Sequence, residues 1–228
     1  MKNRERLKLL ANIVGHIQGD GCISFRRPSR TSKNIYPWMR FNNSCTPLIG
    51  ILAKEIRALF PYAHIFIKER TYPKGNYFLQ VCQSKIVYEF INLGADEHDV
   101  PEWIKNSSHS VKESYLKALF DDEGTVYCGI RKCKNRSSYI TKSIQMTTTS
   151  KKLAFGIRDL LIELKMRPYF TIGKYKINDG EDFAPYFTIG LTNNESILKF
   201  NEMINFDHPI KKEKLISMIN NPRFRFYQ

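Results

Sequence analysis

The chain has 228 residues, enough for one large domain or for two fused units of about 100 residues each. Its hydrophobic content of 42% excludes a disordered chain, and no apolar run approaches the ~20 residues that a membrane-spanning helix needs. The 36 Lys and Arg residues outnumber the 22 Asp and Glu residues, and the net charge of +14 favours a polyanionic partner, foremost nucleic acid.

Cysteine usage and the first residues bear on the compartment. Five cysteines form no CxxC pair, and their odd number is typical of a reducing environment. Met1 is followed by KNRERLKLL rather than by the apolar segment of a secretion signal. We therefore expect an intracellular protein without membrane association, in the cytoplasm of a prokaryote or within a DNA-containing organelle.

The first half of the chain predicts a helix followed by two strand pairs. Residues 6–18 carry apolar residues at intervals of three and four, as in a helix, and this segment ends at Gly19-Asp20-Gly21. Residues 22–60 read as a strand, a basic loop, a strand and an amphipathic helix. Residues 63–94 read as a hairpin and a short helix.

The second half repeats this plan. Residues 111–122 predict a helix that again ends at an acid followed by glycine, and residues 125–206 repeat the same order of strands and helices. The corresponding glycines, Gly21 and Gly124, lie 103 residues apart. The sequence therefore predicts an α+β fold of two pseudo-symmetric αββαββα subdomains, each with a four-stranded antiparallel sheet.

The boundary between the two subdomains is predicted from composition. The stretch 94–110 contains a proline and a run of small polar residues, which are typical of a linker. We expect the first subdomain to span residues 1–105 and the second to span residues 106–228.

The two helix ends carry a recognisable motif. Residues 13–21, IVGHIQGDG, and 116–124, LKALFDDEG, resemble the two nine-residue motifs of the LAGLIDADG homing endonucleases. A single match would be weak, but two matches that each open an αββαββα repeat in a basic chain are specific. The resemblance covers nearly the whole sequence. It implies two saddle-shaped sheets that lie in the major groove of DNA, and a monomer that acts as a pseudo-dimer.

The resemblance also implies which residues are catalytic. The acid before the last motif glycine binds the divalent metal, which assigns this role to Asp20 and Glu123, with Gly19 and Asp122 beside them as further candidate metal contacts. Oxygen ligands suit Mg²⁺ or Mn²⁺, and Ca²⁺ is expected to bind without supporting cleavage. An acid at a helix C-terminus opposes the helix dipole, so its presence in both halves indicates function.

Four motif positions depart from the family pattern. His16 stands where Leu is usual, Gln18 where Asp is usual, Lys117 where a small residue is usual, and Asp122 where Ala or Gly is usual. None of the four changes removes a metal-binding acid. Small residues that remain in both motifs, including Gly15, still allow the two helices to approach closely.

Basic and amide side chains concentrate in the predicted hairpins, where a reader of DNA needs them. The expected DNA-binding residues are Arg26, Arg27, Arg30, Lys33, Arg40, Lys68, Arg70, Lys74, Gln80, Gln83, Arg131, Lys132, Lys134, Arg136, Lys142, Gln145, Lys174 and Lys176. Because the two halves differ in sequence, we expect a long asymmetric target rather than a palindrome.

Polar residues near the acids are expected to support them. By position after the second strand of each half these are Asn42, Asn43, Thr148 and Thr149, although family members usually have Gln or Lys there. A catalytic cation is expected from the stretch 208–214, as Lys211 or Lys212.

The resulting prediction is a sequence-specific DNA endonuclease that acts in intron homing. It would hydrolyse both strands of double-stranded DNA with a divalent metal and leave 3′ overhangs. Two alternatives share the fold: an RNA-splicing maturase, whose partner is intron RNA, and a DNA-binding regulator with weak or no cleavage. The acids at both motif ends favour cleavage.

Overall fold

A computed structural model describes residues 1–27, 34–133, 136–176 and 183–221, with the side chains of residues 130–140 outside the description. The chain divides into two compact units, Met1–Asp122 and Glu123–Gln228. Each unit contains one four-stranded antiparallel sheet, which confirms the predicted α+β class and the repeated plan. Within the described ranges, no helix has the length and apolar character that crossing a membrane would require.

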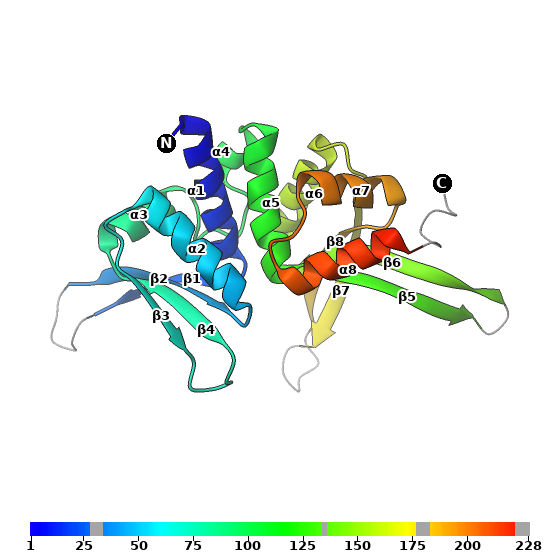
Figure 1. Ribbon diagram of the computed structural model, residues 1–228, viewed down its shortest axis with the longest axis horizontal. Helices are drawn as coiled ribbons and strands as arrows, with labels where there is room; N and C mark the ends of the chain where they lie inside the picture. Colours follow the sequence, from blue (N-terminus) through cyan, green and yellow to red (C-terminus); the bar gives the residue numbers. More distant parts are fainter. Residues whose placement is uncertain (28–33, 134–135, 177–182, 222–228) are drawn as a thin grey trace. The chain divides into compact units, whose positions relative to one another are not determined.

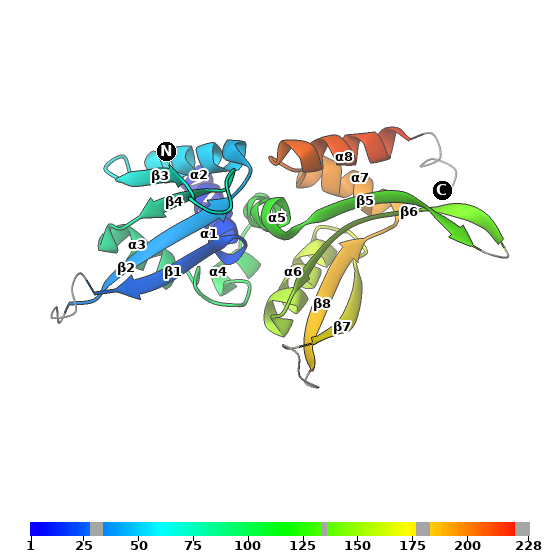
Figure 2. The same ribbon diagram turned by 90° about the horizontal axis from the view of Figure 1, so that it is seen from below.

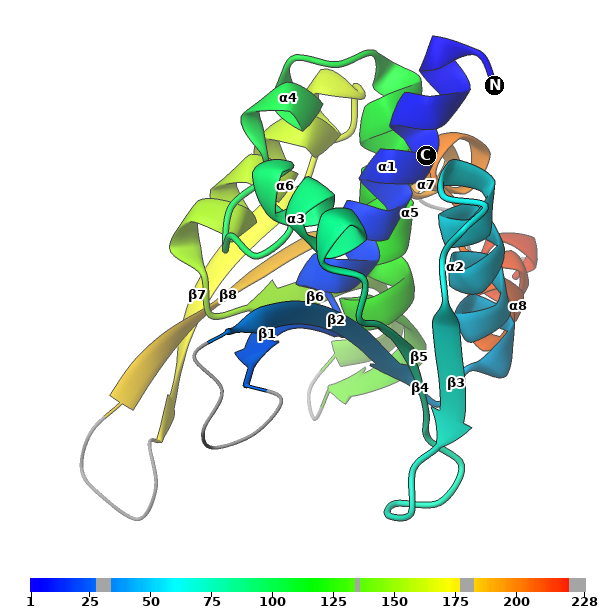
Figure 3. The same cartoon turned by 90° about the vertical axis from the view of Figure 1, so that its left-hand side faces the viewer.

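The first unit is built on a sheet of order β1-β2-β4-β3 (Figure 1). Its elements are α1 (Asn3–Gln18), β1 (Gly21–Arg26), β2 (Tyr36–Asn43), α2 (Thr46–Leu59), β3 (Ile65–Glu69), β4 (Tyr77–Val81), α3 (Ser84–Asn92), α4 (Glu102–Lys105) and α5 (His109–Glu123). Helices α1, α2 and α3 cover one face of this sheet (Figure 3). The compact unit includes nearly all of α5, whereas the predicted linker, residues 94–110, overlaps only the first two residues of this helix.

Burial along β2 alternates, as expected for a strand with one covered face. Met39 and Phe41 are buried against the helices, whereas Trp38 and Arg40 lie on the opposite face. This opposite face, which none of the unit's described helices covers, is called the open face below. The register places Gln80 of β4 beside Arg40 on it.

Helix α1 is more deeply buried than a single apolar stripe predicts. Every residue from Leu10 to Ile17 is buried, because α2, the sheet and α5 all contact this stretch. Two polar residues are therefore buried as well, and each finds a partner: Asn12 donates to Glu55 Oε2 at 2.7 Å, and His16 meets Asp122.

The second unit repeats the order with a sheet β5-β6-β8-β7. Its elements are β5 (Thr125–Cys133), β6 (Arg136–Thr148), α6 (Lys151–Glu163), β7 (Tyr169–Lys176), β8 (Phe183–Leu191), α7 (Asn194–Met203) and α8 (Pro209–Asn220). The long pair β5–β6 is visible in Figure 2. Ser150 and Asn193 cap α6 and α7 by accepting from the backbone N–H three residues on. Helix α8 packs on β5, and neither it nor the short α4 was predicted.

Helices α1 and α5 approach closely at Gly15. A Cβ atom at this position would lie 2.7 Å from Ala118 Cβ and 2.7 Å from the Tyr115 carbonyl oxygen, so the small residues of both motifs are needed here. The prediction that Gly15 permits a close crossing is consistent with this geometry.

We expect Gly15→Ala to lower the free energy of unfolding of the first unit by about 1–3 kcal/mol, because the added methyl overpacks the crossing. Gly50→Ala is the matched control: Gly50 lies in α2 with open space around it, and alanine there should stabilise by about 0.5–1 kcal/mol. Urea unfolding followed by tryptophan fluorescence reports on this unit, since Trp38 and Trp103 both belong to it. Equal effects of the two substitutions would contradict the close crossing.

Candidate functional site

Asp20 lies in the turn between α1 and β1 and is held from several directions. Asn43 Nδ2 donates to Asp20 Oδ2 at 2.7 Å, and the Asn42 N–H donates to the Asp20 carbonyl at 3.2 Å. The Asp20 N–H lies 3.4 Å from Asp122 Oδ2. Asp20 remains partly accessible. Of the two predicted supporting residues in this half, Asn43 touches the carboxylate through its side chain, while Asn42 contacts Asp20 through its backbone.

The three consecutive acids at the end of α5 have different surroundings. Asp121 is buried, and the Asp122 side chain is fully buried, whereas Glu123 is exposed. Accessibility is what a ligand to a metal on DNA requires. The role of Glu123 stays a prediction, but among these three residues its side chain is the most accessible.

Asp122 meets the other unusual motif residue, His16. The His16 Nδ1 and Asp122 Oδ2 atoms lie 2.9 Å apart, with side-chain exposures of 1% and 0%. Burial lowers the pKa of His16, but the Asp122 carboxylate, together with smaller contributions from Glu55 and Asp121, more than offsets this effect, so the pKa is raised. His16 therefore keeps its charged form to a higher pH than an isolated imidazole does.

The donor chemistry is compatible with a divalent metal. Among the described residues, no group of three or more His, Cys, Asp or Glu side chains is arranged to hold a metal ion alone. Asp20 offers a partly accessible carboxylate whose Oδ2 is oriented by Asn43, and Glu123 offers a second, accessible one. Such oxygen ligands suit Mg²⁺ or Mn²⁺, which usually complete their coordination with water and phosphate. Because the Asp122 side chain is buried against His16, Asp122 does not belong to the proposed ligand set, while the predicted metal contact of Gly19 stays a prediction.

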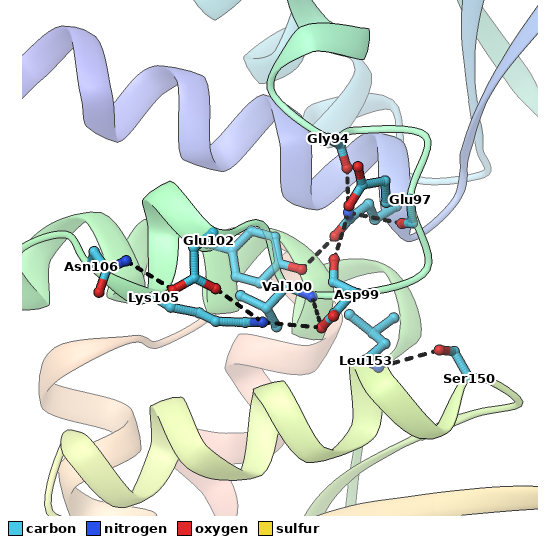
Figure 4. A network of polar contacts seen from close by, with 11 residues as sticks. Gly94, Glu97, Asp99, Val100, Glu102, Lys105, Asn106, Ser150 and Leu153 are labelled. Atoms are coloured by element: carbon cyan, nitrogen blue, oxygen red, sulfur yellow. Dashed lines mark hydrogen bonds and ion pairs between the residues drawn. The ribbon is translucent and has the colours of Figure 1, made fainter.

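Gln18, another departure from the motif, links α1 to the loop before α4 through hydrogen bonds. Its Nε2 donates to the carbonyls of Gly94, Glu97 and Asp99 at 2.9, 3.0 and 3.0 Å, and its Oε1 accepts from Tyr115 OH. Figure 4 labels the three loop residues of this network, Gly94, Glu97 and Asp99. Burial, together with Asp99, raises the pKa of Tyr115 well above its ordinary value and keeps the hydroxyl a donor. Sequence reasoning missed this network because its partners lie almost eighty residues or more along the chain.

The open face of the first sheet carries a pre-organised cluster. The Arg40 guanidinium lies over the Trp38 ring at 4.7 Å and the Phe78 ring at 4.5 Å. Its Nη2 donates to Gln80 Oε1 at 2.6 Å, and Gln80 Nε2 donates to the Cys82 sulfur at 2.9 Å. Two predicted DNA-binding residues thus lie together in one fixed arrangement, which lowers the entropic cost of presenting them to a ligand.

The other predicted DNA-binding residues have varied surroundings. In the first unit, Arg26 donates to the Cys82 sulfur at 3.5 Å, and exposed positions are held by Arg27, Lys68, Arg70 and Lys74. The Gln83 carboxamide instead binds the main chain: its Oε1 accepts from the His64 N–H, and its Nε2 donates to the Tyr62 carbonyl.

In the second unit, Lys174 and Lys176 are exposed on β7. Lys142 donates to Asn194 Oδ1, and partial burial lowers its pKa. Gln145 accepts from Tyr169 OH at 2.5 Å. The remaining predicted contacts lie outside the described residues or have side chains outside the description: Arg30, Lys33, Arg131, Lys132, Lys134 and Arg136.

The remaining predicted residues of the second unit lie at helix starts. Thr148 Oγ1 accepts from the Ser150 N–H at 3.1 Å just before α6, and Thr149 is exposed. Lys211 is half-buried and Lys212 is exposed in the first turn of α8. Their catalytic roles stay predictions.

Comparison with known proteins identifies the fold. No protein-family profile matches the sequence. The chain is 29% identical to a DNA gyrase subunit of Mycobacterium kansasii over 98 residues, which are 42% of this chain but only 16% of that protein.

Solved structures match over much greater lengths. A complex of the homing endonuclease I-DmoI, carrying one substitution, with its target DNA in the presence of Mg has a TM-score of 0.65, at 18% identity over 89% of this chain and 98% of that one. I-DmoI with DNA and Mn has a TM-score of 0.64, at 19% identity over 87% and 97%. The LAGLIDADG homing endonuclease I-SmaMI bound to cleaved DNA has a TM-score of 0.59, at 11% identity over 92% and 88%. The chain therefore has the fold of the LAGLIDADG homing endonucleases, as the two motifs predicted.

Proposed function

We propose that the chain is a sequence-specific, divalent-metal-dependent endonuclease of double-stranded DNA that recognises a long asymmetric site. The carrying observation is the retention of an accessible acid at the end of each motif helix, Asp20 and Glu123, in a fold whose solved examples hold target DNA. The net charge of +14 and the Arg40 cluster on the open face support a DNA partner.

The roles of the chain's own residues follow from their contacts. Asp20 and Glu123 supply the metal-binding carboxylates, and Asn43 orients Asp20 through its 2.7 Å hydrogen bond. Bound Mg²⁺ or Mn²⁺ would supply an activated water and charge stabilisation at the phosphate. Lys211 or Lys212 would add a positive charge near the phosphate.

In line with the resemblance, the proposed product is a double-strand break with 3′ overhangs. The proposed enzyme acts as a monomer. Its proposed location is the cytoplasm of a prokaryote or a DNA-containing organelle. Homing is the biological context that the resemblance implies.

The decisive experiment is cleavage of a randomised double-stranded DNA library with Mg²⁺ or with EDTA, followed by sequencing of the cut ends. Metal-dependent cutting at one long sequence is the expected result. Tight, sequence-specific binding without cutting would overturn the nuclease in favour of a regulator. Selective binding of structured RNA over the selected DNA would overturn it in favour of a maturase.

Arg40 is expected to read a base. Arg40→Ala should weaken binding to the selected DNA by about 1–3 kcal/mol, roughly 5- to 150-fold, because an arginine that contacts a guanine edge contributes about this much discrimination. Filter binding at fixed salt measures the change. Arg57→Ala removes the same charge from an exposed position on α2 and should change affinity little. Equal losses in both variants would reduce Arg40 to a non-specific charge.

A further inference from the structure

Two departures from the motif pattern, which lie 106 residues apart in the sequence, meet in the structure. His16 replaces a usual leucine and Asp122 a usual small residue, yet their side chains form one contact of 2.9 Å. If the two substitutions were independent neutral changes, there would be no reason for the two side chains to be in contact. Their contact at the α1–α5 crossing indicates that the two residues function together.

The His16–Asp122 pair lies in an unfavourable environment for polar groups. Both side chains are essentially inaccessible, and the His16 and Phe41 rings pack in a T-shaped arrangement with ring centroids 5.1 Å apart. A buried pair of this kind is weak evidence for stability, since an apolar pair of similar volume often does as well. Leucine with alanine, the usual residues, would be such a pair, so stability alone does not account for His16 and Asp122.

The pair also contacts the turn that carries Asp20. Asp122 Oδ2 lies 2.9 Å from His16 Nδ1 and 3.4 Å from the Asp20 backbone nitrogen. This approach depends on Gly19, where a Cβ atom would lie 2.7 Å from the same oxygen. Three residues of the motif ends therefore form one arrangement. Gly19 leaves space for the Asp122 carboxylate, and His16 contacts that carboxylate and holds it in place.

With this contact, Asp20 is held at each of its polar groups. Asp122 approaches its backbone nitrogen, the Asn42 N–H donates to its carbonyl, and Asn43 donates to its carboxylate. The β1–β2 sheet supplies the last two contacts. The contact from α5 is the one that depends on the unusual motif residues.

We propose that His16 and Asp122 are a positioning pair that fixes the Asp20 turn, so that the Asp20 carboxylate is oriented before metal and DNA bind. Asp122 acts through the Asp20 backbone rather than as a metal ligand, and His16 acts through Asp122. This inference rests on the proposed function for its consequence, the metal-binding role of Asp20. Its structural content, the restraint on the Asp20 turn, is independent of that function.

The test uses the full chain with the double substitution His16→Leu and Asp122→Ala, which installs the residues usual in the motif. Three quantities are measured: hydrogen exchange at the Asp20 amide by NMR, binding of Mn²⁺ alone by electron paramagnetic resonance, and single-turnover cleavage of the selected DNA. Asp122→Asn, which keeps an acceptor oxygen and the side-chain size, is the conservative variant. Glu5→Gln, an exposed acid at the far end of α1, is the control.

The double variant is expected to fold, with Asp20 amide exchange at least roughly tenfold faster and Mn²⁺ affinity and cleavage reduced by roughly 10- to 100-fold, as for residues that orient metal ligands. Asp122→Asn should recover part of each loss. Wild-type amide exchange and wild-type Mn²⁺ affinity in the double variant would overturn the proposal.

The proposed function fails separately. If the wild-type chain neither binds Mn²⁺ nor cuts DNA, the nuclease assignment falls, and amide exchange at Asp20 still decides whether the pair restrains the turn.

Discussion

Replacement of either motif acid is expected to abolish DNA cleavage while leaving DNA bound. Asp20→Asn and Glu123→Gln each keep the side-chain size but remove the negative charge that a divalent metal requires. We expect the single-turnover cleavage rate to fall by at least about 10³-fold, which corresponds to about 4 kcal/mol of transition-state stabilisation. Affinity for the selected DNA in Ca²⁺ should change by less than roughly threefold.

The controls for this result come from each unit. Glu5→Gln and Glu202→Gln neutralise exposed acids on α1 and α7, and both variants should cut at the wild-type rate. Urea unfolding should place Asp20→Asn near wild type, because an asparagine oxygen can still accept from Asn43. Cleavage by Asp20→Asn or Glu123→Gln within a few-fold of wild type would disprove the assignment of these acids as metal ligands.

The repeated architecture could be predicted because its signals are local. Apolar periodicity, turn residues and the acid-glycine ends recur at a fixed spacing, and the sheets, their strands and most helices follow from them. Helix α8 escaped prediction because its buried residues are few, Leu215 and Met218, so its apolar pattern is weak. Gln83 illustrates a different limit: a residue type suited to reading bases instead holds the main chain before α3.

The departures from the motif could not be interpreted from sequence, because each finds its partner across a large sequence separation. Gln18 alone resembles a lost acid, and Asp122 alone resembles an obstacle to close helix packing. In the structure Gln18 binds the loop before α4, and Asp122 fits beside Gly19 and pairs with His16. Pairwise geometry, which periodicity does not encode, changes both interpretations.

The stability of the first unit is expected to show strong coupling between His16 and Asp122. His16→Leu leaves the Asp122 carboxylate buried without its histidine, and Asp122→Ala leaves the histidine buried without its carboxylate and opens space. Each single change should cost about 3–5 kcal/mol of the free energy of unfolding. The double variant should lose far less than the sum, because an apolar pair of similar volume is often neutral.

Urea unfolding monitored by tryptophan fluorescence measures the free energy of unfolding of the wild type, the two single variants and the double variant, since both tryptophans lie in the first unit. Additive losses would show that the two side chains stabilise the unit independently, contrary to their 2.9 Å contact. The expected outcome separates two properties that a single substitution confounds. A double variant that regains stability but not metal affinity would show that the pair is retained for the position of Asp20, and that ordinary packing at the crossing can replace it in every other respect.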